Sequence, residues 1–201
     1  MVQFTCYHGT SIENAQSILS EKRFRPSVDR DSLRLGRGAY FFCQMGSSRY
    51  AWDCARDLEW FHKSKHPKGF GILSCKISCD DDALFDMYEP EVMECFHQIR
   101  YHLYEKHKEM DPGFMFEHAY AADTETLNLI RKTRSIAIIR CPQFFGMFER
   151  ENRIKFSGSR QFPKTYVPNV VLICADTEKA TISDIQLVEE GQFDDEFRFS
   201  V

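Results

Sequence analysis

Apolar residues occupy every second position over residues 2–6, and polar residues lie between them. This period of two predicts a strand that ends near His8. Thr10 then stands three residues before Glu13, which is the spacing of a capping box, and apolar residues recur at helical intervals over residues 12–19. The pattern predicts a turn from strand to helix, with His8 at its leading edge.

The same two periodicities continue to the end of the chain. The predicted helices cover residues 46–62, 83–108 and 114–132, and the predicted strands cover residues 70–78, 135–141, 170–175 and 182–188. The last of these helices is interrupted before residue 124. No repeat or flexible linker divides the pattern. We therefore expect a single domain over residues 1–201 of the α+β class, with a helical excursion over about 80–132 and a tail over 189–201.

The composition is that of an ordinary globular protein, with 43% hydrophobic and 28% charged residues. A net charge of −4 argues against a broad grip on a nucleic-acid backbone, although basic residues gather between Arg131 and Lys164. That cluster is interpreted either as a solvated loop surface or as the approach path of a macromolecular acceptor. The sequence has no apolar run of the roughly 18–20 residues that a membrane helix needs and no secretory pattern at its start. We therefore expect no membrane contact, and a location in the cytoplasm or in a target cytoplasm into which the protein is delivered.

The eight cysteines are scattered singly, mostly within apolar stretches. They are interpreted as small buried side chains in a reducing compartment. Cys75 and Cys79 share one face of a predicted strand with Ile77, and no second pair completes a metal site, so we expect no bound metal. The acidic run at residues 80–82 precedes a helical pattern and is interpreted as a cap that compensates the helix dipole.

A second motif, with the sequence LGRGAYFF, lies at residues 35–42. Two glycines ahead of an aromatic strand let a ligand approach the backbone closely or allow a positive φ. A Gly-x-Gly pair alone is often only a turn, and a histidine beside a glycine is most often buried and satisfied by the backbone. The ordered set of Tyr-His-Gly-Thr, a Phe-x-Pro stretch, Gly-x-Gly-x-Tyr-Phe and a serine-rich helix start is much less common.

That ordered set resembles the ADP-ribosyltransferase superfamily, in particular its diphtheria-toxin-like and poly(ADP-ribose)-polymerase-like branch, over residues 4–56. The resemblance implies the ADP-ribosyltransferase fold, in which helices flank a split core of mixed and antiparallel β-sheet, and it implies NAD as the co-substrate. It also implies that His8 binds the ribose on the adenosine side and that the Gly9 backbone holds the nicotinamide carboxamide. Tyr40 would stack on the nicotinamide ring.

The resemblance extends this NAD-binding set to residues on either side. Thr10 and Gly38 belong to the same two turns. Ser48 stands eight residues after Tyr40, where the family tends to place a hydroxyl that contacts the carboxamide. The second stacking aromatic is expected to be Tyr50, with Trp52 as the alternative, because the spacing fits neither of them cleanly.

The third family position falls at the start of the predicted strand over residues 170–174, where polymerase-like members carry a glutamate. This chain has Asn169 there. An amide can accept a hydrogen bond from the ribose hydroxyl, but it brings no negative charge and cannot act as a base. Elongation to a polymer is therefore not expected, and Glu117, Glu149 and Glu151 are candidates for a compensating acid.

From these residues we expect a mono-ADP-ribosyltransferase of the His-Tyr-x type, with His8, Tyr40 and Asn169 at its centre and a protein or nucleic acid as acceptor. The resemblance implies a toxin, effector or phage-defence context only loosely, and it leaves room for a partner protein that neutralises or delivers the enzyme. The missing glutamate keeps open an inert module that binds NAD or ADP-ribose, and a hydrolase differs only in using water as acceptor. An enzyme that removes an RNA 2′-phosphate is disfavoured, because Tyr40 stands where it would need a second histidine.

Overall fold

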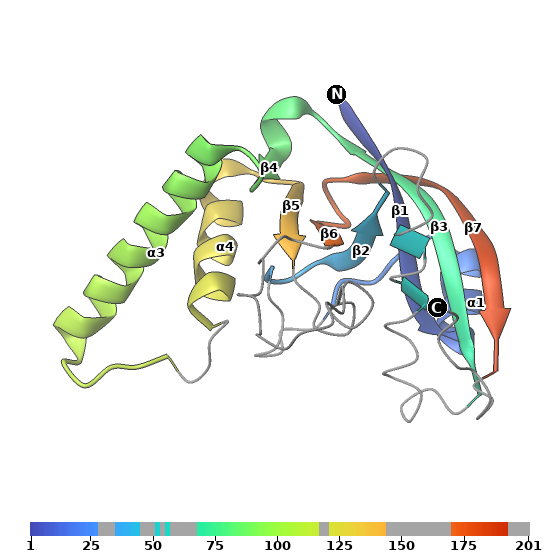
Figure 1. Cartoon of the computed structure of the whole chain (residues 1–201), viewed down its shortest axis with the longest axis horizontal. Helices are drawn as coiled ribbons and strands as arrows, with labels where there is room; N and C mark the ends of the chain where they lie inside the picture. Colours follow the sequence, from blue (N-terminus) through green and yellow to red (C-terminus); the bar gives the residue numbers. More distant parts are fainter. Residues whose placement is uncertain are drawn as a thin grey trace, which may run out of the picture.

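The structure of the chain, a computed structural model, describes residues 1–27, 35–44, 51–52, 55–56, 68–116, 121–143 and 170–192. These residues form an α+β protein with one seven-stranded sheet, which is mixed but mostly antiparallel, and three α-helices (Figure 1). The α+β class expected from the sequence is confirmed.

The elements follow one another from strand to helix and back to strand. In chain order they are β1 (Val2–Ser11), α1 (Ile12–Glu21), β2 (Ala39–Cys43), β3 (Phe70–Cys79), the short 3₁₀ helix η2 (Asp81–Ala83), β4 (Leu84–Asp86), α3 (Pro90–Met110), α4 (Ala121–Arg134), β5 (Ile138–Gln143), β6 (Val170–Ala175) and β7 (Thr181–Gly191). Residues 51–52 and 55–56 are also helical, within the helix predicted over 46–62.

The strands are hydrogen-bonded in the order β4-β5-β6-β2-β1-β3-β7, and only β4 and β5 are parallel neighbours. The junction at the middle of this sheet is narrow. β1 pairs with β3 along its whole length, from Val2 to Ser11, but its register with β2 consists of Cys6 opposite Cys43 and Tyr7 opposite Phe42. Beyond Tyr7 the described parts of β1 and β2 separate.

Side chains alternate between the two faces of the sheet, and each face has its own apolar core. On one face Ala15 of α1 packs in a cluster with Phe24 and Phe41. On the other, Phe42 clusters with side chains of α3 and α4, and Tyr7, Tyr40 and Trp52 pack against that cluster. Residues 8 and 41 therefore belong to the α1 face, and residues 7, 40 and 42 to the opposite face.

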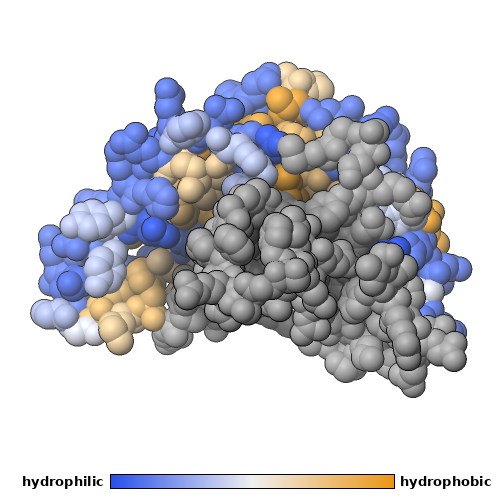
Figure 2. Space-filling model, in the orientation of Figure 1, coloured by the Kyte–Doolittle hydropathy of each residue, from blue (hydrophilic) through white to orange (hydrophobic). Residues whose placement is uncertain are grey.

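Helices α3 and α4 lie side by side at the β4 end of the sheet (Figure 1). They are joined by the pairs Arg100–Asp123 and His107–Glu125, each at 2.9 Å. On the face seen in Figure 2, hydrophilic residues cover much of the outer side of this pair and hydrophobic ones gather at its tip. Met110 and Met115 at that tip are 69% and 82% exposed.

The first turn differs from the prediction in one respect. β1 continues to Ser11 because its pairing with β3 extends to Ser11 opposite Phe70. The N-cap of α1 is therefore Ser11, whose Oγ accepts a hydrogen bond from the Asn14 amide at 3.3 Å. The prediction that Thr10 caps this helix was wrong. His8 lies inside the strand rather than at the leading edge of a turn.

The helical excursion also departs from its prediction. The acidic run does not cap a long helix, because η2 and the strand β4 follow it and α3 begins only at Pro90. No helix begins near Phe114, and α4 starts at Ala121. β4 has three residues and is held by parallel pairing with β5, from Leu84 opposite Ile138 to Asp86 opposite Arg140.

The strand predictions fare better. The prediction over residues 170–175 is confirmed as β6, and that over 70–78 is confirmed with one further residue at its end. β5 begins three residues later than predicted, after Ser135, which has φ 54°. β7 extends to Gly191, so the first residues of the predicted tail belong to the sheet, and residues 193–201 lie outside the described residues.

Candidate functional site

His8 links the two motif strands. Its Nδ1 lies 2.8 Å from the carbonyl oxygen of Tyr40, and because a carbonyl can only accept, Nδ1 is the donor. Burial lowers the pKa of His8, so the ring is neutral near pH 7 and Nε2 is its acceptor atom. The ring is packed edge-on against Phe24 at 5.3 Å and tilted against Phe41 at 5.6 Å, which fixes its orientation.

Gly9 lies in β1 two residues beyond Tyr7, where the pairing of β1 with β2 ends. Thr5 accepts a hydrogen bond from the Gln44 amide at 2.8 Å, so the backbone groups of Thr5 face β2. Backbone groups of alternate residues in an antiparallel pair face the same neighbour, so those of Tyr7 and Gly9 face the same way. The described register with β2 ends at Tyr7. The N–H and C=O of Gly9 therefore face the gap between the two strands.

Tyr40 is held by the glycine loop that precedes it. Its hydroxyl donates to the carbonyl of Gly36 at 2.7 Å and accepts from the amide of Leu35 at 3.0 Å. Burial raises the pKa of this hydroxyl, so Tyr40 is not an acid or a base near neutral pH. With its hydroxyl fixed, the partly buried ring is suited to act as a rigid face rather than as a reacting group.

Helix α4 clamps the same loop from its other side. The guanidinium of Arg131 donates to the carbonyl of Arg37 and, at 2.9 Å, to the carbonyl of Cys174. A Cβ at Gly38 would lie 2.6 Å from the sulfur of Cys174, so no larger residue fits where the loop crosses β6. The loop is therefore fixed between α4 and the sheet, and Arg131 is a buried structural residue.

A pocket of about 230 Å³ opens on the α1 face beside His8. It is lined by two cationic, four other polar and two apolar residues: Arg23, Arg25, His8, Thr10, Asn14, Ser17, Ile18 and Phe24. Sequence reasoning found His8 and Thr10 and missed Asn14, Arg23 and Arg25. Thr10 and Asn14 stand four residues apart across the junction of β1 and α1, a spacing that was a usable signal, and Nδ2 of Asn14 lies 3.4 Å from Oγ1 of Thr10.

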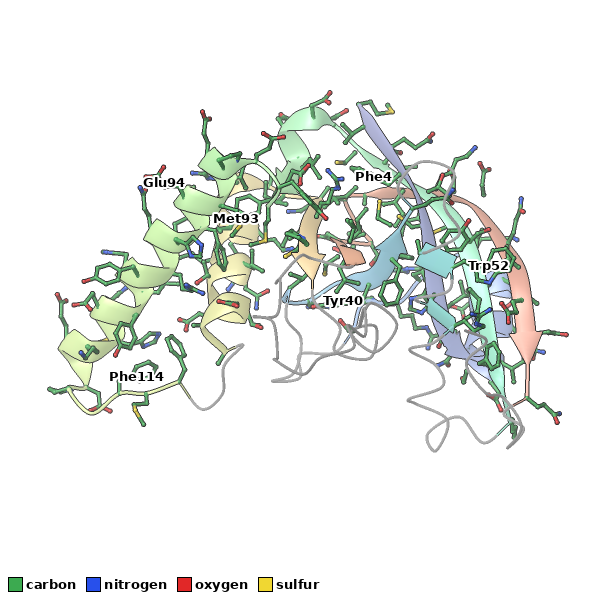
Figure 3. The ribbon with its side chains drawn as sticks, viewed as in Figure 1. Phe4, Tyr40, Trp52, Met93, Glu94 and Phe114 are labelled. Carbon is green, nitrogen blue, oxygen red and sulfur yellow. The ribbon has the colours of Figure 1, made fainter. Side chains whose placement is uncertain are left out.

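The opposite face of β1 carries a second polar cluster. Trp52 stacks on Tyr7 with 5.9 Å between ring centroids and 24° between planes, and its Nε1 donates to Oε2 of Glu189 at 2.6 Å. The hydroxyl of Tyr7 donates to Oε1 of Gln44 at 2.8 Å. Figure 3 shows Trp52 over the half of the sheet formed by β1, β3 and β7, and Tyr40 at the start of β2. Glu189 was not among the candidate acids.

Several predicted site residues lie outside the described residues. They are Ser48, Tyr50, Asn169, Glu117, Glu149 and Glu151. The basic cluster between Arg131 and Lys164 lies largely outside them too, but Arg131 is buried, and Arg140 pairs with Asp86 at 2.7 Å. These two arginines therefore do not contribute to a solvated basic surface.

The described part of the chain contains no group of three or more His, Cys, Asp or Glu side chains placed to hold a metal ion. The seven cysteines described are unbridged, and all but Cys95 are buried. Cys75, Ile77 and Cys79 pack into the same core cluster, as expected for one face of a strand. No helix within these ranges is both long and apolar enough to cross a membrane.

Comparison of the chain with models of known families, with curated proteins and with solved structures gave no match. The structure thus defines an α+β protein whose single sheet opens at its centre. Next to that opening are a neutral histidine, the backbone groups of a glycine and a fixed tyrosine ring.

Proposed function

We propose that this protein is a mono-ADP-ribosyltransferase that binds NAD across the gap between β1 and β2. The observation that carries the proposal is that His8, Gly9 and Tyr40, which the sequence motifs single out, meet at this one opening through the bond from His8 to the Tyr40 carbonyl. The order of the sheet also supports it, because β6, which follows Asn169, is the next strand beyond β2. A narrow junction at the sheet centre is compatible with the split sheet of the ADP-ribosyltransferase fold.

The adenosine side of NAD fits the pocket on the α1 face. Nε2 of the neutral His8 is an acceptor that suits a ribose hydroxyl, and Asn14 offers a further amide. Arg23 and Arg25 bring positive charge suited to a diphosphate, since guanidinium groups bind phosphate oxygens in pairs. Arg25 is held at 2.8 Å by Glu21, which keeps its side chain near the pocket rim.

The nicotinamide side fits the opposite face. The Gly9 N–H and C=O have the donor and acceptor that a carboxamide needs, and glycine leaves room for the ring to approach. The Tyr40 ring is fixed by its hydroxyl bonds and can stack on the cationic pyridinium, which contributes about 0.5–2 kcal/mol. Holding the leaving group flat and immobile favours departure of nicotinamide from the ribose carbon.

The test is to incubate the purified protein with NAD labelled on its adenylate phosphate and with a cell lysate divided into nuclease-treated and protease-treated halves. Free nicotinamide and macromolecular label are both measured. Label that survives protease identifies a nucleic-acid acceptor, and label that survives nuclease identifies a protein acceptor. Nicotinamide without label would identify a hydrolase. Bound NAD without either product would identify a binding module, which the amide at Asn169 favours as the second candidate.

The assignment of residues is tested with two substitutions and two matched controls. His8→Ala and Tyr40→Ala should abolish transfer and nicotinamide release while circular dichroism shows a retained fold. His102→Ala and Tyr101→Ala change the same residue types at exposed positions of α3 and should leave both products unchanged. Labelling by the His8 or Tyr40 variant at the level of its control would remove the assignment.

A further inference from the structure

The proposed reaction lacks a carboxylate at the family position, because Asn169 stands there. A carboxylate beside the nicotinamide ribose stabilises the cation-like transition state through its negative charge. It also takes up the proton that the acceptor group loses. Among the described residues, a carboxylate that serves this purpose must lie on the face of β1 that carries Tyr7, near Gly9.

Glu189 meets that requirement through the register of the sheet. Ile72 of β3 is opposite Gly9 of β1 on one side and opposite Glu189 of β7 on the other. The three residues form one row across the sheet. Neighbouring strands lie about 4.8 Å apart, so the Glu189 backbone is about 10 Å from that of Gly9.

A β-bulge turns the Glu189 side chain toward this face. The register of β3 with β7 shifts between Ile72 and Leu73, whose partners are Glu189 and Leu187, so Val188 is an additional residue. Leu187 lies on the α1 side, since a Cβ at Gly71 would meet its Cδ1 at 3.4 Å and α1 at Ala15. Without the bulge, residues 187 and 189 would share that face. With it, Glu189 points to the opposite face.

Trp52 then fixes the carboxylate above β1. Its Nε1 donates to Oε2 of Glu189 at 2.6 Å while its ring stacks on Tyr7, two residues before Gly9. A hydrogen bond to an ionised oxygen is about twice as strong as a neutral one, so this contact orients the group as well as holding it. Within the described part of the chain Trp52 occupies Oε2 and no other hydrogen bond or ion pair holds Glu189, so Oε1 remains for a ligand.

We propose that Glu189 is the catalytic carboxylate of this protein and that Trp52 positions it; this inference rests on the proposed function. In the step it serves, the bond between the ribose C1′ and the nicotinamide nitrogen breaks, and its electron pair leaves with nicotinamide. A lone pair of the acceptor's O–H or N–H forms the new bond to C1′. The acceptor's proton passes to the Glu189 carboxylate and then to water, so the products are nicotinamide, the ADP-ribosylated acceptor and a proton.

The test compares Glu189→Gln with Glu190→Gln, the exposed neighbour on the same strand. Steady-state nicotinamide release gives kcat and the KM for NAD, and NAD binding is measured by calorimetry. Glu189→Gln should lower kcat about 10²–10³-fold, the range for removal of a group that stabilises transition-state charge, with KM and NAD affinity changed less than about twofold. Glu190→Gln should match the wild type. Trp52→Phe, which keeps a ring on Tyr7 and removes the N–H, should lower kcat by a smaller factor.

The outcomes separate this inference from the proposed function. A wild-type protein that neither binds NAD nor releases nicotinamide refutes both. A wild-type protein that turns over, with Glu189→Gln equal to Glu190→Gln in kcat, overturns the role of Glu189 alone. Glu189→Asp guards against a merely structural effect, because it keeps the charge and should retain part of the rate. If it loses as much activity as Glu189→Gln, the carboxylate charge is not what the reaction uses.

Discussion

Replacement of Arg131 by methionine should destabilise the protein by about 3 kcal/mol. The Arg131 side chain is buried and donates to the carbonyls of Arg37 in the glycine loop and Cys174 in β6. A hydrogen bond from a charged donor contributes about 1.5–3 kcal/mol, so the two together contribute about 3–6 kcal/mol. Methionine has a similar length but leaves both carbonyls without this donor.

The desolvation of the Arg131 charge reduces this loss of stability. Removing a buried charge returns part of the free energy spent on its desolvation, and the Nε atom of Arg131 has no hydrogen-bond partner among the described residues. The net effect is therefore expected near the lower limit, at about 3 kcal/mol. A protein of this size shifts its melting temperature by about 2–4 °C for each kcal/mol, so Arg131→Met should melt about 6–12 °C lower.

Thermal melting and urea denaturation, both followed by circular dichroism, measure this effect. Arg134→Met is the matched control, because Arg134 is an exposed arginine in the last turn of the same helix and should change stability by less than about 0.5 kcal/mol. If the two variants melt within about 3 °C of one another, the two carbonyl contacts of Arg131 do not stabilise the glycine loop.

Three further predictions address the core, the histidine and the sheet edge. Gly71→Ala should cost about 1–3 kcal/mol in urea denaturation, because its Cβ would lie 2.6 Å from that of Ala15. Burial lowers the pKa of His8, so below about pH 6.5 the unfolded chain binds more protons than the folded one; stability should fall from pH 7 to 5, and His8→Gln should reduce that fall. Asp86→Ala should cost about 3 kcal/mol by leaving the half-buried Arg140 unpaired.

Each of these has a control on the same chain. Gly113→Ala is in an exposed turn and should be nearly neutral, so equal losses at residues 71 and 113 would contradict the close packing. His102→Gln replaces an exposed histidine of α3 and is the matched variant, and a wild-type slope in His8→Gln would show that His8 does not contribute to the pH dependence of stability. Lys76→Ala breaks an exposed pair with Asp184 and should cost less than about 1 kcal/mol; a loss equal to that at residue 86 would refute the burial argument.

Local sequence was enough to predict the elements whose side chains repeat regularly. The strand predicted over residues 170–175 has the observed bounds of β6, and the strand predicted over residues 70–78 matches β3 to within one residue. The two glycine motifs also marked the right strands, and the structure brings His8 and Tyr40 into contact. The bounds of these strands depend on interactions between near neighbours in the chain, which a single sequence contains, whereas the contact between His8 and Tyr40 joins two strands.

Long-range pairing decided the rest. Ser11 rather than Thr10 caps α1 because β3 extends the strand to that point. β4 has too few residues for a periodic pattern to predict it, and its pairing with β5 holds it in the sheet. Arg131, which its sequence neighbours mark as a surface charge, is buried because two backbone carbonyls from distant segments need its donors.

Some features of the candidate site also follow from the local sequence, and others depend on long-range pairing. The sequence by itself determined which residue types stand at the strand ends, including an amide at Asn169 where a carboxylate was expected. Only the tertiary structure brought Glu189 to the row of Gly9, through a bulge and a cross-sheet register that no local pattern encodes. The physical reason is that one inserted residue reverses the face of a strand, and whether a residue is inserted depends on the partner strand rather than on the chain itself.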